Sequence, residues 1–170
     1  MSRSARVLLL AMMLTAFGLI AWSAEAPFSL TLNVTPTVVK PGAKIAVEVV
    51  LTNTSNKEIF VSRDAGFQAE MDYKIEVLDR DGKRPPETRY LRAVRGEDTG
   101  HPSMVVTGDY GNFPLKPGEA TKDTTNLAEL FDLSRPGEYV IHVERIDPMS
   151  KATVKSNTVT VTVIVKDAGE

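Results

Sequence analysis

The sequence contains no cysteine, so the protein can form no disulfide, no thiolate nucleophile, no cysteine metal site and no cysteine-linked lipid anchor. Histidine is scarce as well, with only His101 and His142, and the single tryptophan, Trp22, lies in the N-terminal apolar segment. The motifs G-x-S-x-G and H-E-x-x-H are absent, and so is a phosphate-binding glycine loop. These absences predict a protein that is not an enzyme and carries no cofactor, with no catalytic residue and no metal ligand.

The charge balance shows no excess of either sign. The chain has 20 lysines and arginines against 22 aspartates and glutamates, a formal net charge of -2. A nucleic-acid-binding protein or a polybasic membrane-surface protein needs surplus cationic side chains, so we expect neither nucleic acid nor membrane as a partner. With 170 residues, of which 42% are hydrophobic, the chain is long enough for one ordinary domain.

The N-terminus has the features of a secretory signal peptide, predicted at residues 1–26. Two arginines precede an apolar run at 7–20, and small residues follow it. The run is short for a membrane span, which favours cleavage over anchoring. Cleavage is expected after Ser23 or after Ala26, which leaves a domain at 27–170 that is exported to the periplasm or the cell exterior. Export without disulfides favours a bacterial source.

The remaining chain alternates apolar and polar residues in short segments separated by proline, glycine, asparagine and aspartate. Period two is the pattern of a strand with one buried face. Residues 108–118 are expected to be a loop, and 127–133 a single helical turn. Strands are predicted at 28–34, 44–53, 58–62, 71–79, 88–94, 103–107, 120–127, 137–146 and 157–165. Seven to nine such strands without a long amphipathic helix predict an all-β antiparallel sandwich.

The segment Leu-Ser-Arg-Pro-Gly-Glu-Tyr-Val-Ile at 133–141 resembles the entry to the sixth strand of immunoglobulin-like folds. There, a tyrosine after a turn donates a hydrogen bond to backbone just upstream, and Tyr139, preceded by Pro136 and Gly137, fits that tyrosine corner. Together with the Pro-Gly turn at 117–118, the segment is similar to uncharacterised secreted bacterial proteins with an immunoglobulin-like domain. The cysteine pair and core tryptophan of antibody domains are missing, so no antibody binding loop carries over.

The least regular part of the mature chain, 83–118, is the predicted binding surface. Arginine and tyrosine are favoured at interface hot spots. The candidate residues are Arg84, Arg89, Tyr90, Arg92, Arg95, Tyr110 and Phe113. Equally consistent with the sequence is an edge strand whose charged side chains block sheet-to-sheet aggregation. The first reading predicts a non-enzymatic interaction or structural module whose partner is another protein of the bacterial envelope.

Two alternatives remain open at the sequence level. A protruding loop at 96–102 would suit a sandwich that inhibits proteases. A periplasmic copper carrier would use histidine and methionine ligands, which suit copper. The candidates are His101, Met104, His142 and Met149, although they show no tight spacing. Alternation places His142 on the face of its strand opposite Tyr139, Ile141 and Val143, where solvation is the simplest expectation.

Overall fold

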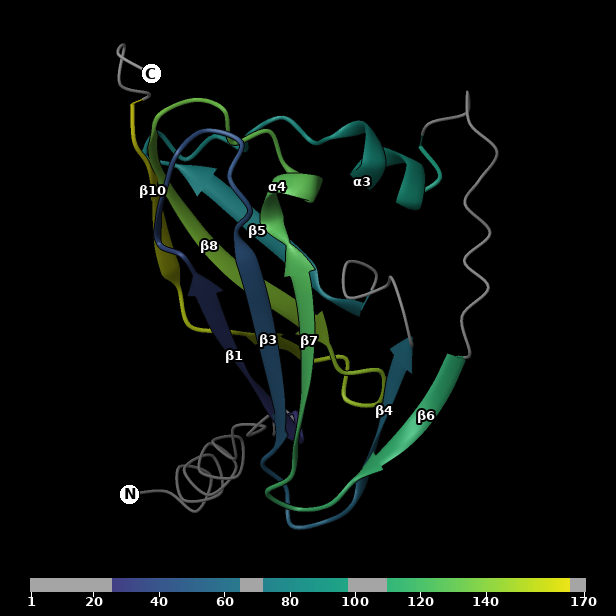
Figure 1. The fold of residues 1–170 in the computed structure, drawn as a ribbon. Helices are drawn as coiled ribbons and strands as arrows, with labels where there is room; N and C mark the ends of the chain where they lie inside the picture. Colours follow the sequence, from purple (N-terminus) through teal and green to yellow (C-terminus); the bar gives the residue numbers. More distant parts are fainter. Residues whose placement is uncertain (1–25, 65–71, 98–109, 166–170) are drawn as a thin grey trace, which may run out of the picture.

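The computed structural model describes residues 26–64, 72–97 and 110–165 (Figure 1). The all-β class predicted from the sequence is confirmed, since most of these residues lie in strands and the sheets are mainly antiparallel. The described strands are β1 (Phe28–Thr35), β2 (Val38–Val39), β3 (Ala46–Asn53), β4 (Ile59–Asp64), β5 (Lys74–Asp79), β6 (Tyr110–Leu115), β7 (Ala120–Asn126), β8 (Gly137–Ile146), β9 (Thr153–Lys155) and β10 (Val159–Val163). The described helices are α3 (Arg89–Val94) and α4 (Leu127–Leu130). The predicted leader and the predicted strand at 103–107 fall outside the described residues, apart from Ala26.

The strands form three sheets. One sheet has the order β1-β3-β7, and a second has the order β2-β10-β8-β5, with β9 also paired to β8. β4 and β6 pair only with each other, as a two-stranded ribbon. Figure 1 shows the two larger sheets as separate layers, with the ribbon beside their lower end and α3 beside their upper end. The pairings between the described strands are antiparallel, except for the short parallel contact between β2 and β10.

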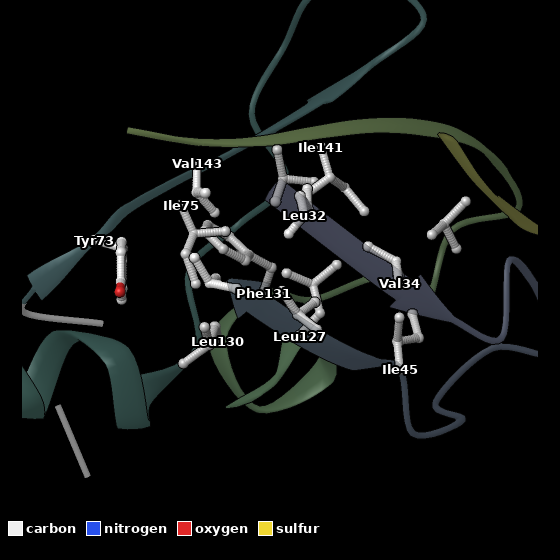
Figure 2. Packing of buried hydrophobic residues seen from close by; sticks show 14 of the residues in the cluster. Leu32, Val34, Ile45, Tyr73, Ile75, Leu127, Leu130, Phe131, Ile141 and Val143 are labelled. Carbon is white, nitrogen blue, oxygen red and sulfur yellow. The ribbon is translucent and has the colours of Figure 1, made fainter. Parts of the chain in front are cut away.

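The apolar rows of the two larger sheets meet in one core (Figure 2). In β1 and β3 the predicted alternation holds, because every second residue is buried and Leu32 pairs with Val49. In β8 the inward row is Tyr139, Ile141 and Val143, as the pattern predicted. Leu127, Leu130 and Phe131 close one end of the core from α4 and the residue after it. This burial of apolar surface is the main favourable term in folding.

The prediction of a strand at 88–94 is wrong, because Arg89–Val94 form helix α3. The side chain of Thr88 accepts a hydrogen bond from the backbone N–H of Leu91 at 3.2 Å, which is the bond of a helix N-cap. Within α3 only Leu91 is fully buried. A strand would instead bury every second residue of this segment. The predicted helical turn after Leu127 is confirmed, with Asn126 as the N-cap of α4.

The prediction of a loop at 108–118 is also wrong, because β6 occupies Tyr110–Leu115 and pairs with β4. Sequence alternation is weak here, since the strand contains a glycine and a proline. A Cβ on Gly111 would lie 3.0 Å from two ring atoms of Phe113, so a larger residue there would require the exposed ring to shift. With the short strands β2 and β9, β6 brings the described strands to ten, above the seven to nine expected.

A polar contact joins all three sheets beside the apolar core. The hydroxyl of Tyr73, whose residue is 1% exposed, donates a hydrogen bond at 3.0 Å to Asp123 Oδ2 on β7. The guanidinium of Arg145 on β8 lies over the Tyr73 ring, 5.1 Å from its centre, and donates to the backbone oxygen of Ser62 on β4 at 3.3 Å. Burial, and next the charge of Asp123, raise the pKa of the Tyr73 phenol, which therefore stays a donor.

Asn53 at the end of β3 is a second buried polar anchor, 1% exposed. Its Nδ2 donates to the backbone oxygens of Lys57 and Leu115, each at 2.8 Å, and its Oδ1 accepts from the backbone N–H and the hydroxyl of Ser55. The side chain therefore fixes the turn before β4 and holds the end of β6.

Among the helices that the structure describes, none has the length and hydropathy of a membrane span.

We expect Asn53→Ala to lower the free energy of unfolding by about 2–3 kcal/mol, because buried backbone groups would lose their partners. Urea unfolding followed by circular dichroism measures this change. Asn33→Ala is the matched control: Asn33 is exposed and bonds Glu48 at 3.0 Å, so its loss should change stability by less than about 0.5 kcal/mol. Equal effects of the two substitutions would contradict the role assigned to Asn53.

Candidate functional site

Three of the predicted binding residues form an exposed row on α3. Arg89, Arg92 and the C-cap residue Arg95 are exposed and follow one another at every third position, while Leu91 of the same helix is buried. Arg92 Nη1 donates to the backbone oxygen of Glu87 at 3.1 Å, and Arg95 Nη1 lies 2.7 Å from Glu87 Oε1. Glu87 thus orients two guanidinium groups toward the same side. We refer to Arg89, Arg92 and Arg95 as the arginine row.

The remaining predicted binding residues do not lie in one patch with the arginine row. Arg84 pairs with Glu76 on the outward face of β5, with 2.6 Å between Nη2 and Oε1. Tyr90 is partly buried and packs against the core. Phe113 is 52% exposed on the β4–β6 ribbon, and for Tyr110 only the backbone is described. The predicted surface at 83–118 is therefore divided among α3, the outer face of β5 and the ribbon.

The predicted structural residues lie together at the start of β8. The Tyr139 hydroxyl donates to the backbone oxygen of Arg135 at 2.8 Å, four residues upstream, and the ring is 5% exposed. Gly137 has a φ of 152°, which side-chain-bearing residues rarely adopt. Pro136 is exposed in the turn between these residues. The bond from the Tyr139 hydroxyl to the Arg135 backbone is the hydrogen bond that a tyrosine corner requires.

The outward face of β5, β8 and β9 carries an ordered charge network that sequence reasoning did not find. Glu144 lies opposite Lys74 of β5 and opposite Lys155 of β9, with Nζ–O distances of 3.3 and 2.7 Å. Two residues further along β5, Glu76 pairs directly with His142 of β8. We refer to Lys74, Glu76, Arg84, His142, Glu144 and Lys155 as the charge network.

His142 is on the outward face, as its alternation with buried Tyr139, Ile141 and Val143 predicted, but it is not simply solvated. Its Nε2 lies 3.3 Å from Glu144 Oε1 and 3.9 Å from Glu76 Oε2, and its side chain is 20% exposed. Among the described residues, Glu76, His142 and Glu144 offer three metal-ligating atoms within 4.8 Å of one another.

The cations of the network keep both carboxyl groups ionised. The hydrogen bond from Lys155 is the largest cause that lowers the pKa of Glu144 to about 2, against the partial burial that opposes it. The hydrogen bond from Arg84 likewise lowers the pKa of Glu76. Conversely, Glu76 and Glu144 raise the pKa of Lys74. Glu76 and Glu144 therefore remain ionised at neutral pH.

One sequence signal could have pointed to this network. Lys74 and Glu76, and also His142 and Glu144, are polar residues two positions apart within otherwise apolar strands, so each pair projects to the same outward face. Which strands pair was not readable, because β5 and β8 are about 65 residues apart along the chain. The convergence of the two pairs is a property of the tertiary structure.

A cavity of about 210 Å³ lies between the turn before β3 and the end of α4, lined in part by Val39, Ala43, Phe131 and Leu133. Its volume is below the roughly 300 Å³ at which pockets for drug-sized ligands begin. Of the four residues considered for copper, His101 and Met104 lie outside the described residues. Met149 is 91% exposed after the end of β8.

No protein-family model matches the chain, and no curated protein matches it. Among solved structures, it is similar to the Pseudomonas fluorescens alkylpurine DNA glycosylase AlkC bound to DNA containing an abasic site analog. The sequence identity is 16% and the TM-score 0.41, over 82% of this chain and 31% of the glycosylase chain. A similarity at this level assigns neither an activity nor a substrate.

That neighbour nevertheless contradicts three expectations from the sequence. The first is the non-enzymatic envelope module, with its inhibitor and copper alternatives. The second is the absence of enzymatic activity, and the third is the exclusion of nucleic acid as a partner. Composition and the absence of motifs do not decide these three points. Net charge averages over the whole chain, whereas a ligand meets a local surface. The absence of a sequence motif excludes only those reactions whose catalytic residues follow one another at a fixed spacing in the sequence.

The lowered pKa of Glu144 predicts an acid dependence of stability. A carboxyl group with a folded-state pKa of about 2 and an ordinary value of 4.5 stabilises the fold above pH 4.5. That stabilisation is lost as the pH falls toward 2. We therefore expect the free energy of unfolding to decrease over this interval, and Glu144→Gln to flatten the decrease. Urea unfolding at a series of pH values measures it, and an unchanged slope in the variant would contradict the assignment.

Proposed function

We propose that the protein is an exported immunoglobulin-like domain that binds a phosphate-bearing polyanion through the arginine row of α3. The domain is assigned to 27–170, after a secretory leader at 1–26, and its destination is the periplasm or the cell exterior. Two features support the immunoglobulin-like assignment. The core lies between two mainly antiparallel sheets, and Tyr139 makes a tyrosine-corner bond to Arg135 at 2.8 Å.

The single observation that carries the binding function is the spacing and exposure of the arginine row. Consecutive members are three helical residues apart, which corresponds to a rise of about 4.5 Å. A strand of duplex DNA carries one phosphate per roughly 3.4 Å of helix axis. A row of closely spaced cations therefore suits a repeating anion better than an isolated one.

The guanidinium groups of Arg92 and Arg95 keep donors available for a ligand. Arginine has five N–H donors in a planar fork that matches phosphate oxygens. In the described structure, one nitrogen of Arg92 and one of Arg95 bond to Glu87. These bonds restrict the side chains before binding, which reduces the entropy lost when a ligand is captured.

The local charge supports the same conclusion. Residues 87–97, which include α3, contain three arginines and two glutamates, a net charge of +1, within a chain whose net charge is -2. The segment is therefore a cationic region on an otherwise acidic protein. Such a region attracts anions even where the whole molecule does not.

The binding function is tested by fluorescence anisotropy with a labelled DNA duplex, with inorganic polyphosphate as competitor. We expect affinity to fall as salt rises, and Arg92→Ala to reduce the slope of log K against log salt by about 1. Displacement by polyphosphate would show recognition of phosphate charge in general, and its failure would indicate recognition of nucleic acid in particular.

Lys122→Ala is the matched control, since it also removes one positive charge. Lys122 lies on β7 of the β1-β3-β7 sheet, away from α3, and its Nζ is 3.2 Å from Glu48 Oε2. This control should retain the slope of the unsubstituted protein. Binding that is absent at low salt, or that falls equally in Arg92→Ala and Lys122→Ala, would overturn the proposed function.

The leader is tested by mass spectrometry of the protein secreted from a bacterial host. We expect the mature chain to begin at Ala24 or at Pro27, because the small residues of a signal peptide lie just before its cleavage site. Leu9→Arg puts a charge in the apolar run and should leave the leader attached and the protein inside the cell. An unprocessed N-terminus in the unsubstituted protein would contradict a cleaved leader.

A further inference from the structure

We propose that Glu76, His142 and Glu144 form a binding site for a divalent transition metal of the zinc class on the outward face of the β5–β8 pair. The proposal is independent of polyanion binding, because it concerns a different surface and different residues. It rests on the convergence of one imidazole and two carboxylate groups from two adjacent strands.

The distances between the ligand atoms suit one shared ion. Zinc binds nitrogen and oxygen ligands at about 2.1 Å, so neighbouring ligands of a tetrahedral site lie about 3.4 Å apart. Here His142 Nε2 lies 3.3 Å from Glu144 Oε1 and 3.9 Å from Glu76 Oε2, and all three ligand atoms lie within 4.8 Å. Small side-chain rotations are enough to bring them around a central ion.

The scaffold holds the three side chains in place. Glu76 and His142 are direct partners in the antiparallel register, and Glu144 follows His142 by two residues on the same face. Their side chains are between 13% and 20% exposed, which is low for charged groups on an outward sheet face. Ligands on paired strands are positioned more accurately than ligands on loops.

The donor set selects the class of ion. Imidazole with carboxylate is a ligand set for zinc and neighbouring divalent metals, whereas calcium requires six to eight oxygen ligands. Three protein ligands leave a fourth position of a tetrahedral ion open for water or an anionic ligand.

The three cations of the charge network regulate how tightly an ion is held. Lys74, Arg84 and Lys155 now occupy the carboxylate oxygens, and their side chains are 54%, 55% and 63% exposed. Exposed ion pairs contribute little to stability, so these flexible side chains can turn toward solvent when an ion binds. Their positive charges nevertheless oppose a divalent ion, so removing one of them should strengthen metal binding.

Isothermal titration of the untagged, chelator-treated mature protein with Zn²⁺ tests the site. We expect one zinc ion per chain, and a loss of affinity in His142→Ala that exceeds the roughly 10- to 100-fold effect of losing an outer-shell partner. Lys155→Ala should bind zinc more tightly, by roughly 5-fold or more, because a charge near the ion is removed. Calcium should produce no comparable heat.

Glu138→Gln is the matched control, since Glu138 is an exposed carboxylate on the same strand and face, four residues before His142. It should bind zinc like the unsubstituted protein, and circular dichroism without metal should show that all variants are folded. Absence of zinc binding would overturn the site. So would binding that His142→Ala leaves unchanged, or a Lys155→Ala variant that binds more weakly.

Discussion

The register of the β5–β8 pair is the constraint on which the rest of the structure depends. Ile75 pairs with Val143 and Val77 with Ile141, so four apolar side chains enter the core together. A shift of one residue would turn this row to solvent and bring charged residues inside. Burial of the apolar row therefore specifies the register far more strongly than the exposed ion pairs do.

Because successive side chains point to opposite faces, the same register determines the outward face. Placing Ile75 inward places Lys74 and Glu76 outward, opposite Glu144 and His142. The charge network therefore follows geometrically from the packing of the core. Its ion pairs then add order: Lys155 and Lys74 approach Glu144 from the strands on either side, and Arg84 reaches Glu76 from the chain after β5.

The same pairing also positions the polar contact beside the core. Tyr73 and Arg145 continue the inward rows of β5 and β8, where the apolar pattern gives way to polar residues. Asp123 from the other large sheet accepts the Tyr73 hydroxyl, and the Arg145 guanidinium reaches the ribbon at Ser62. One strand pair thus contacts the core, the opposite sheet and the ribbon, while the arginine row lies apart on α3.

Binding functions on this protein therefore belong to local surfaces. The arginine row belongs to a short helix that packs on the core through Leu91 and Tyr90. Its three cations therefore do not follow the two-residue alternation of the strands. The charge network instead contains nearly equal numbers of both signs, which favours internal pairing. Chain-averaged charge describes neither surface, so a net charge of -2 does not by itself decide which partner a local surface binds.

The amino-acid sequence by itself determined the all-β class and most strand positions, because period-two burial is a local pattern. It predicted the inward rows of β1, β3 and β8 and the outward position of His142. It did not reveal β6, whose glycine and proline break the pattern, or α3, where capping by Thr88 outweighs an apparent strand. Only the tertiary structure decided that Glu76 faces His142 and that Tyr73 meets Asp123. Those partners lie 50 residues or more apart, and strand pairing over such separations depends on the packing of the whole core.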